Sequence, residues 1–311
     1  MTVLFVSYAD WANMGQTLAE CLQSVEVQAL AITLHSLRGE WPRKSRAVVP
    51  AVARRLARSA DTIVWMHSRY TPVPTEGKKL LVFHGGSEFR LRTEKALKMF
   101  NPIADVSLVQ TGELLGRGAK NEVWLLPAVD TKHIKPKFSV HQELVFAHYP
   151  SNGPKDREIK GSSVINAVMQ NLSGGFEYRF QHRPQPVVPW AEYMKMIADC
   201  DVYIESLSHG SATWNKHDWS ITALEAAALG KIVVTNFTTL ERYGKEYGEC
   251  ALMVANTGEE LRVVVEDILT WSGTEVLHKQ AETRLWVEKL HSYKAVGSRL
   301  KKIIEGICTK Q

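Results

Sequence analysis

Short apolar runs, each followed by a polar stretch, divide the first half of the chain into alternating strands and helices. Runs of roughly four to eight apolar residues are typical of buried strands, and apolar residues at intervals of about three or four are typical of helices. The expected strands are Val3–Ser7, Val27–Leu34, Asp61–His67, Lys79–His84, Val106–Gln110 and Val123–Leu126. The expected helices are Gln16–Val25 and Ala47–Ser59. Because strands and helices alternate, the pattern predicts a parallel sheet with helices on both faces.

The same alternation returns after Pro127–Lys137, a stretch with little apolar periodicity that we expect to be a linker. The expected strands are Leu144–His148, Phe176–Gln181, Val202–Glu205 and Ile232–Thr235. The expected helices are Ser163–Leu172, Tyr193–Asp199 and Thr222–Leu229. A last helix is predicted over Arg284–Ile307, where apolar residues recur at helical spacing.

The chain is therefore expected to be an α/β protein built from two doubly wound, Rossmann-like halves. Residues 1–137 would form the N-terminal domain, residues 138–283 the C-terminal domain, and residues 284–311 a terminal helix. Sheets of this kind bind ligands beyond the carboxyl ends of their strands. With two such halves, the site is expected in the cleft between them.

Composition narrows the class of protein. The 311 residues are 45% hydrophobic and 23% charged, which is typical of a globular chain long enough for two domains. No uninterrupted apolar stretch of about 18 residues is present, so no membrane span is expected. The first residues have the pattern of a strand, not that of a signal peptide. The cysteines Cys21, Cys200, Cys250 and Cys308 lie far apart, which favours free thiols in the cytoplasm and argues against a zinc site.

One segment of the first half is strongly basic, although the net charge of the whole chain is only +5. Its basic residues are Arg38, Arg43, Lys44, Arg46, Arg54, Arg55 and Arg58, and Glu40 is the acid among them. Such a cluster can bind the phosphates of lipids or nucleic acids. It can equally be the solvated face of a helix, and the sequence leaves both interpretations open.

Candidate chemistry gathers where a helix is predicted to begin, near Ser220–Thr222. The first amides of a helix lack partners and carry partial positive charge, which suits a diphosphate. Glu225 lies one turn further along and could accept hydrogen bonds from ribose hydroxyls. Thr222 and Glu225 also have the spacing of a capping box, in which both side chains only close the helix start. The spacing leaves these two roles open.

A second candidate follows the predicted strand that ends at His148. Arg157 and Lys160 would converge on a phosphate as charged donors, and Gly161 would let the backbone approach it closely. Ser151 and Asn152 precede them in the same loop and are further candidate binding residues. A solvated basic loop is the alternative that these residues alone leave open.

Taken in order, these stretches resemble the donor domain of glycosyltransferase family 4. The matching positions are Arg157, Lys160–Gly161, Trp190–Tyr193, Asp199–Asp201 and Thr222–Val234. That family uses an arginine and a lysine–glycine pair for the donor's diphosphate and a glutamate–alanine helix for its nucleotide. The resemblance covers nearly the whole chain. It implies a GT-B fold with two domains facing across a cleft, a metal-independent site, transfer with retention of configuration, and a terminal helix that packs back on the N-terminal domain.

The resemblance also assigns roles to individual residues of the donor side. It implies that Arg157, Lys160 and the helix start at Ser220, Ile221 and Thr222 bind the donor, with Glu225 as a further functional residue. Gly15 would lie against the donor phosphate, although many members have a glycine pair there. His217 stands where many members carry the first of two glutamates, so the contact with the sugar differs from theirs.

The N-terminal half is similar to the family more loosely. His67 and His84 each end a predicted strand, and the family's histidine at the first of these places lies near the transferring sugar. Ser87 and Arg90 follow in a loop that resembles one found in some members, and they are acceptor-side candidates. For both histidines, purely local hydrogen bonding is the alternative interpretation.

The resemblance therefore implies a glycosyltransferase whose substrate is a nucleotide-sugar, most simply a UDP- or GDP-sugar, with no cofactor and no covalent protein nucleophile. The acceptor would be a glycan or a lipid-linked glycan, with peripheral membrane association through Arg38–Arg58. Two alternatives stay open: a phage-type transferase that modifies a hydroxymethylated DNA base, and a non-catalytic nucleotide-sugar-binding protein. A GT-B epimerase would need carboxylates around the sugar that the sequence does not offer.

Overall fold

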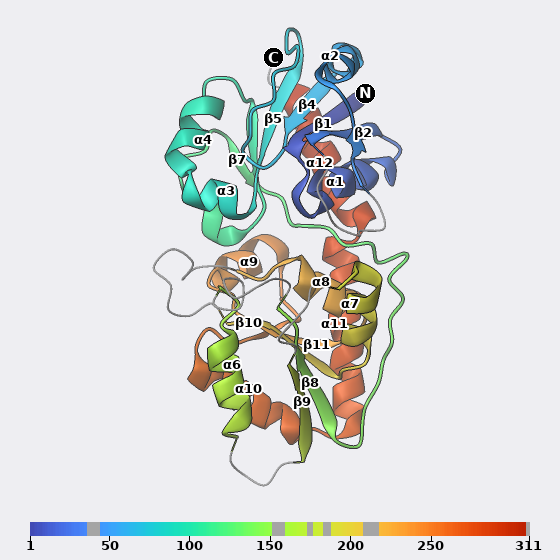
Figure 1. Ribbon diagram of the computed structural model, residues 1–311, viewed down its shortest axis with the longest axis vertical. Helices are drawn as coiled ribbons and strands as arrows, with labels where there is room; N and C mark the ends of the chain where they lie inside the picture. Colours follow the sequence, from blue (N-terminus) through green and yellow to red (C-terminus); the bar gives the residue numbers. More distant parts are fainter. Residues whose placement is uncertain (36–43, 151–158, 173–176, 183–187, 208–217, 309–311) are drawn as a thin grey trace. The chain divides into compact units, whose positions relative to one another are not determined.

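The computed structural model describes residues 1–35, 44–150, 159–172, 177–182, 188–207 and 218–308 (Figure 1). Its internal contacts divide the chain into two compact units. Unit 1 comprises Met1–Ala128 together with Leu290–Gln311, and unit 2 comprises Val129–Lys289. Unit 1 is therefore assembled from two separate stretches of the chain, and the first passage between the units falls inside the expected linker.

Among the described residues, seven parallel strands form the sheet of unit 1, in the order β3-β2-β1-β4-β5-β6-β7. In chain order they are β1 (Thr2–Ala9), β2 (Gln28–His35), β3 (Arg46–Ala47), β4 (Thr62–Trp65), β5 (Lys79–His84), β6 (Val106–Val109) and β7 (Glu122–Trp124). The order reverses between β1 and β4, which pair directly, with Val6 opposite Trp65. The crevice beyond the carboxyl ends of two such strands is the usual place for a ligand.

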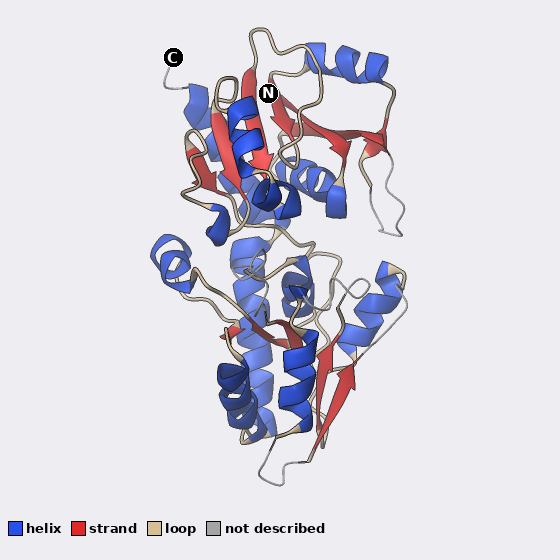
Figure 2. Ribbon diagram, turned by 60° about the vertical axis from the view of Figure 1, so that its left-hand side comes forward, coloured by secondary structure: helices blue, strands red, loops and turns tan. Residues whose placement is uncertain are grey.

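Helices cover both faces of this sheet (Figure 2). They are α1 (Met14–Gln23), α2 (Pro50–Ser59), α3 (Gly86–Leu91), α4 (Thr93–Phe100) and α12 (Tyr293–Cys308), with 3₁₀ turns at Trp11–Asn13 and Gly112–Leu114. Successive side chains of a strand point to opposite faces. The four successive residues Val3–Val6 are each at most 2% exposed, so both faces of β1 are buried.

The C-terminal helix α12 packs against α1 within unit 1. At Gly297 the two backbones are so close that a Cβ would lie 2.0 Å from the carbonyl oxygen of Cys21. Just before α12, Nδ1 of His291 donates to the carbonyl of Pro127 at 2.8 Å. Burial lowers the pKa of His291 to about 3, although the Pro127 carbonyl acts in the opposite direction. A neutral histidine therefore joins the place where the chain leaves unit 1 to the place where it returns.

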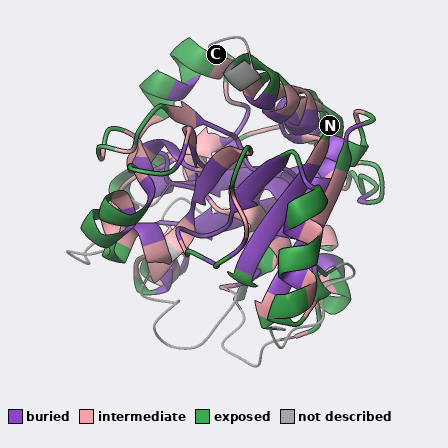
Figure 3. Ribbon diagram, turned by 90° about the horizontal axis from the view of Figure 1, so that it is seen from above, coloured by how far each residue is buried: buried purple, intermediate pink, exposed green. Residues whose placement is uncertain are grey.

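The sheet of unit 2 has five parallel strands among the described residues, in the order β12-β11-β10-β8-β9. They are β8 (Leu144–His148), β9 (Tyr178–His182), β10 (Val202–Ser206), β11 (Ile232–Thr235) and β12 (Met253–Val254). The helices are α6 (Ser162–Gln170), α7 (Trp190–Ala198), α8 (Ile221–Ala228), α9 (Leu240–Tyr247), α10 (Gly258–Leu269) and α11 (Gly273–His291). The order reverses between β8 and β10. In Figure 3, the strands of unit 1 are mainly buried and its helices have exposed outer faces.

The structure confirms the α/β class and corrects several elements. The predicted helix Ala47–Ser59 begins only at Pro50, and Arg46–Ala47 is the short strand β3. Helices α3, α4, α9 and α10 and strand β12 were not predicted. The predicted single helix over Arg284–Ile307 is wrong, because α11 and α12 are separated at Ser292, whose hydroxyl accepts the amide of Ala295 at 3.3 Å. No helix in the described part of the chain is both long and apolar enough to span a bilayer.

Candidate functional site

The carboxyl ends of β8 and β10 in unit 2 bring together a lysine, a glutamate and two hydroxyls. Lys160 lies between β8 and α6, and Glu205 is near the end of β10. Nζ of Lys160 donates to Oε1 of Glu205, and it donates to Oγ of Ser220 at 3.0 Å. The hydroxyls of Ser220 and Thr222 donate to the same Oε1 at 2.6 Å and 3.2 Å. Residues that are far apart in the sequence thus meet where the strand order reverses, which is where a doubly wound sheet binds its ligand.

Glu205 is ionised inside the protein. Its side chain is 0% exposed, and such burial alone would raise the pKa. The charge of Lys160 and the surrounding hydrogen bonds outweigh the burial and hold the pKa of Glu205 well below its usual range. On its other oxygen, Oε2, Glu205 accepts from Ser206 and, at 2.9 Å, from Thr235 of β11.

Helix α8 begins beside this ion pair. Ser220 occupies the residue before the helix, but its side chain makes no capping hydrogen bond. Within the described residues, the amides of Ile221 and Thr222 have no acceptor, and both residues are half-buried. Unpaired amides at a helix start carry partial positive charge and favour an anion. The arrangement therefore offers an ammonium and open amides to the same ligand.

Glu225 lies one turn into α8 and does not close the helix start. Its Oε1 accepts the indole N–H of Trp190 from α7 at 2.6 Å. Burial raises the pKa of Glu225 to about 7, while the Trp190 bond acts against the shift. Thr222 bonds instead with Glu205 and Ser220, so the capping-box interpretation of Thr222 and Glu225 is wrong for this structure.

Gly161 has a structural reason to be glycine. Its φ is +69°, and a Cβ there would lie 1.8 Å from the carbonyl oxygen of Leu207. The amide of Leu207 donates to the carbonyl of Lys160 at 2.9 Å. This close approach to the chain that leaves β10 fixes Lys160 beside Glu205, while an approach of Gly161 to a phosphate stays a prediction.

Four predicted donor-side residues, Ser151, Asn152, Arg157 and His217, lie outside the described residues. Asp218, which follows His217 in the chain, is buried. Its carboxylate accepts from the amide of Thr238 at 2.7 Å and from the hydroxyl of Thr239 at 2.5 Å. Asp218 therefore holds the segment that leads into α9.

In unit 1, the carboxyl ends of β1 and β4 carry the pair Asp10 and His67. Oδ1 of Asp10 lies 3.3 Å from Nε2 of His67, and Oδ2 accepts the hydroxyl of Ser45. Asp10 also accepts the amides of Gly15 at 2.7 Å and Gln16 at 3.1 Å. Burial opposes ionisation of Asp10, but His67 and the other hydrogen bonds lower its pKa. The first amides of α1, including that of Gly15, are thus bound to an internal carboxylate.

His67 and His84 occupy different environments. His67 and Ser68 are both in the left-handed backbone region, at φ values of 58° and 55°, which is a strained conformation for residues other than glycine. The Ser68 hydroxyl lies 2.8 Å from Nδ1 of His84. His84 is fully buried and stacks on Phe89 at 4.2 Å, and burial lowers its pKa to about 4. His84 is therefore neutral and enclosed at physiological pH.

The two acceptor-side candidates lie on α3. Ser87 belongs to that helix. The Arg90 side chain is 8% exposed, and its guanidinium forms an ion pair with the buried side chain of Glu113, which also accepts from Thr111 at 2.8 Å. This ion pair joins α3 to the turn that follows β6.

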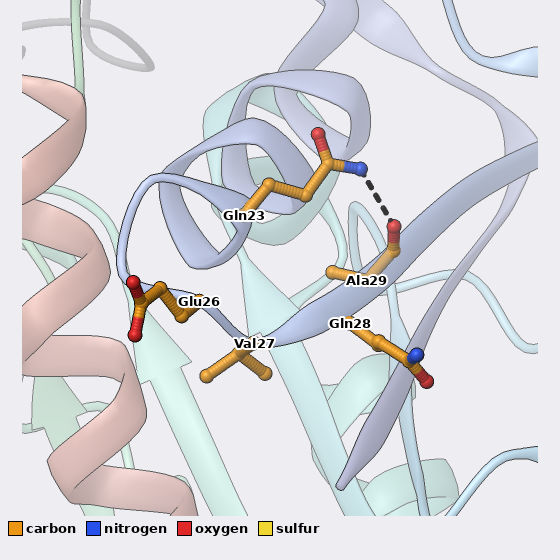
Figure 4. Close-up of a pocket in the computed structure, with 5 residues that line it drawn as sticks. All are labelled: Gln23, Glu26, Val27, Gln28 and Ala29. Atoms are coloured by element: carbon orange, nitrogen blue, oxygen red, sulfur yellow. Dashed lines mark hydrogen bonds between the residues drawn. The ribbon is translucent and has the colours of Figure 1, made fainter.

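Two surface hollows lie away from the candidate residues. One, of about 400 Å³, is lined by Gln23, Glu26, Val27, Gln28 and Ala29 (Figure 4). It lies where β2 begins, whereas the candidate residues lie at the carboxyl ends of strands. The other is lined by residues of α11 and Trp271. Neither hollow is lined by a candidate residue.

Sequence reasoning missed Glu205, Asp10 and Ser45 as site residues. A charged residue at the carboxyl end of an apolar strand is the signal that could have indicated Glu205, and Asp10 stands directly after β1 in the same way. Ser45 carries no signal of its own, because its partner lies 35 residues away. In the described part of the chain, no three His, Cys, Asp or Glu side chains gather as a metal site would require.

No family model and no curated protein matches the sequence. Solved structures are similar in fold over the whole length. HepE from Anabaena, in complex with UDP, has a TM-score of 0.66 at 10% identity, with 98% of this chain and 100% of that chain covered. Sucrose-phosphate synthase from Thermosynechococcus elongatus has a TM-score of 0.61 at 12% identity, with 100% of both chains covered. The lipopolysaccharide outer core galactosyltransferase WaaB has a TM-score of 0.58 at 10% identity, covering 98% and 99%. At such identities the likeness establishes the fold, which is GT-B.

Proposed function

We propose that this protein is a glycosyltransferase that binds a nucleotide-sugar donor through unit 2. The observation that carries the proposal is the meeting of Lys160 with the open start of α8 at the carboxyl ends of β8 and β10. An ammonium beside unpaired amides is a seat for the diphosphate of such a donor. The complexes of HepE with UDP and with UDP-glucose support this class of ligand, because HepE has the same fold.

The chemistry proposed for the site is stabilisation of the leaving group. When the bond between the sugar and the diphosphate breaks, negative charge grows on the phosphate oxygens. Donors that are already in place stabilise this charge without a cost of reorganisation. Lys160 and the amides of Ile221 and Thr222 would act in this way, together with Arg157 of the same loop. No protein nucleophile and no cofactor enter the proposed reaction.

Glu225 would contact the nucleotide. It is one turn from the helix start, and Trp190 bonds only to its Oε1. In the part of the chain that the structure describes, the second oxygen, Oε2, has no hydrogen-bond partner, and we propose that it accepts a ribose hydroxyl. UDP and GDP are the nucleotides we propose first.

The test is a hydrolysis and transfer screen with UDP-, GDP-, ADP- and TDP-sugars. Release of nucleoside diphosphate from one of them, and its loss in Lys160→Met, supports the enzyme. Tight binding without turnover would identify a non-catalytic nucleotide-sugar-binding protein instead. Conversion of the donor to its epimer, without release of nucleotide, would identify an epimerase.

Two finer features belong to the same proposal. The hydrogen-bond donors of Lys160, Arg157 and the start of α8 would take the place of a metal ion, so activity should survive EDTA. The transfer should retain the anomeric configuration, as the resemblance to family 4 implies. Restoration of a lost activity by magnesium or manganese would contradict the first feature. NMR of the first product, before mutarotation, decides the second.

For the acceptor we propose a glycan or lipid-linked glycan at a membrane surface. Arg54, Arg55 and Arg58 of α2 are exposed, and Val49 beside them is 62% exposed. In the described part of the chain, none of these arginines has an ion-pair partner. Exposed basic residues favour anionic headgroups. They also favour DNA, and a modified base in a duplex remains the alternative acceptor.

A further inference from the structure

The carboxylate of Glu205 has no capacity left for a substrate. Its Oε1 accepts from Lys160, Ser220 and Thr222, and its Oε2 accepts from Ser206 and Thr235. A carboxylate offers about four lone-pair positions. These donors therefore saturate it, and any effect of Glu205 on a ligand acts through its partners.

Two of the three N–H groups of the Lys160 ammonium are bound within the protein. An ammonium has three N–H groups, of which one donates to Glu205 and one to Ser220. The third has no acceptor within the described residues, and the side chain is 12% exposed. Two bonds thus fix the direction in which the remaining N–H can serve a ligand.

Ser220 is held away from its own helix. A serine before a helix normally accepts an amide of the first turn. Here its hydroxyl donates to Glu205 at 2.6 Å and accepts from Lys160 at 3.0 Å. The helix start has no side-chain cap. The same carboxylate that fixes Lys160 therefore also keeps the Ser220 hydroxyl off the amide of Thr222, which stays open beside that of Ile221.

We infer that Glu205 is a positioning residue, which holds the ammonium of Lys160 and the hydroxyl of Ser220 in the arrangement that receives the donor's diphosphate. This role rests on the proposed function. Glu205 also neutralises the charge of Lys160, so the diphosphate site without its ligand is not strongly cationic. The stabilisation that the Lys160 ammonium gives to the diphosphate then grows with the negative charge that appears there as the bond to the sugar breaks.

The first test is Glu205→Gln, which keeps the shape of the side chain and removes its charge. We expect kcat to fall by at least about tenfold, while the donor KM changes by less than about threefold. Loss of the negative charge favours anion binding and loss of the fixed geometry opposes it, so the two effects offset each other in KM. A kcat that stays within about threefold of the wild type would overturn the inference.

Asp201→Asn is the matched control. Asp201 precedes β10 at its other end and is equally buried, and it accepts from His141, from Ser139 and from the amide of Val145. Within the described part of the chain, the hydrogen-bond partners of Asp201 include neither Lys160 nor Ser220. The control should lose stability and keep both kinetic constants. If Glu205→Gln loses only stability, as Asp201→Asn does, its role is structural.

A second readout does not depend on catalysis. The rate at which an N-hydroxysuccinimide ester acylates Lys160 can be measured by peptide mass spectrometry, with the other lysines as internal references. In Glu205→Gln the Lys160 amine loses its ion pair, which should raise its acylation rate by about threefold or more. Asp201→Asn should leave this rate unchanged. An unchanged rate would overturn the inference even if the wild type is an active transferase. A raised rate in a protein without turnover would support the hold on Lys160 and refute the proposed function.

If Glu205→Gln does not fold, Thr235→Val tests whether Glu205 positions Lys160. Thr235 donates to Oε2 from β11, and valine keeps its shape and suits a strand. The charge of Glu205 remains, but one of its anchors is lost. We expect a smaller rise in Lys160 acylation and a smaller fall in kcat. If neither changes, the inference is wrong.

Discussion

Trp190 donates its indole N–H to Oε1 of Glu225 at 2.6 Å, and this bond joins α7 to α8. Burial raises the pKa of Glu225 to about 7 in spite of it. A carboxyl group whose pKa is higher in the folded state holds its proton more tightly there than in the unfolded chain. Its contribution to stability is therefore present at low pH and is lost as the pH rises from the ordinary value through about 7.

Glu225→Gln should remove this pH dependence. Between about pH 5 and pH 8 the wild type should lose about 1–3 kcal/mol of unfolding free energy that the variant does not lose. Urea unfolding at a series of pH values measures the difference. Parallel curves for the two proteins would show that Glu225 is not protonated in the folded state at pH 5.

Trp190→Phe should alter how nucleotide binding depends on pH. The ionised form of Glu225 accepts ribose hydroxyls, so affinity for UDP or GDP should rise as the pH passes through about 7. The Trp190 bond favours that ionised form, and its loss should move the rise to higher pH. Titration calorimetry across the range measures the midpoint. A midpoint that does not move would separate Trp190 from the ionisation of Glu225.

Gly161→Ala should be far more harmful than Gly77→Ala. The two glycines have nearly the same φ, +69° and +67°, but a Cβ at Gly77 meets nothing within 4 Å. The left-handed conformation alone costs about 1–2 kcal/mol. At Gly161 the contact with the Leu207 carbonyl comes in addition, and we expect a further loss of at least about 2 kcal/mol. Thermal unfolding compares the pair, and equal losses would contradict the close approach.

Asp10→Asn should lower stability near neutral pH by about 1–3 kcal/mol, because His67 and the amides of α1 lose an ionised partner. The pKa of Asp10 is lowered in the folded state. Its contribution is therefore present above the ordinary pKa of an aspartate and is lost as the pH falls below it. The wild type and the variant should converge only once the pH falls below the lowered pKa of Asp10 in the folded state. A stability gap that persists in acid would be evidence against an ionised Asp10.

The exposed arginines of α2 give a prediction about the acceptor. Wild-type binding to anionic vesicles should weaken steeply with salt, and joint replacement of Arg54, Arg55 and Arg58 by glutamine should abolish it. Replacement of Lys95, Lys98 and Lys120, also exposed in unit 1, makes the same change in charge and should leave binding intact. Sedimentation with vesicles measures both. Binding to duplex DNA alone would favour the base-modifying alternative, and binding to neither would favour a small soluble acceptor.

The sequence predicted the fold well where polar residues bound an apolar run on both sides. Lys79–His84, Leu144–His148 and Ile232–Thr235 were predicted with their observed bounds. Helix α9 was missed because Tyr243 is its buried residue and the rest is mainly polar. The break at Ser292 was missed because the apolar spacing of α11 continues into α12 across it.

The candidate site was predictable only where its residues lie at a strand end or a helix start. Lys160, Ser220 and Thr222 were selected from the sequence, and the structure brings them into contact. Glu205 lies 45 residues from Lys160, so only the tertiary structure shows that it links them. The environment of His84 could not be predicted either, since the ring of Phe89 that stacks on it belongs to α3, a helix that the sequence did not indicate.

The two-part construction of unit 1 has a consequence for biosynthesis. Residues 1–128 leave the ribosome first, but α1 keeps an uncovered face until α12 follows at 293–308. Residues 129–289 form a continuous unit and can fold earlier. The half that is translated first is thus completed last, which reverses the usual N-to-C order of domain folding. Premature termination between the units would leave an N-terminal half without α12. The side of α1 at Cys21 would then be open to chaperones and proteases.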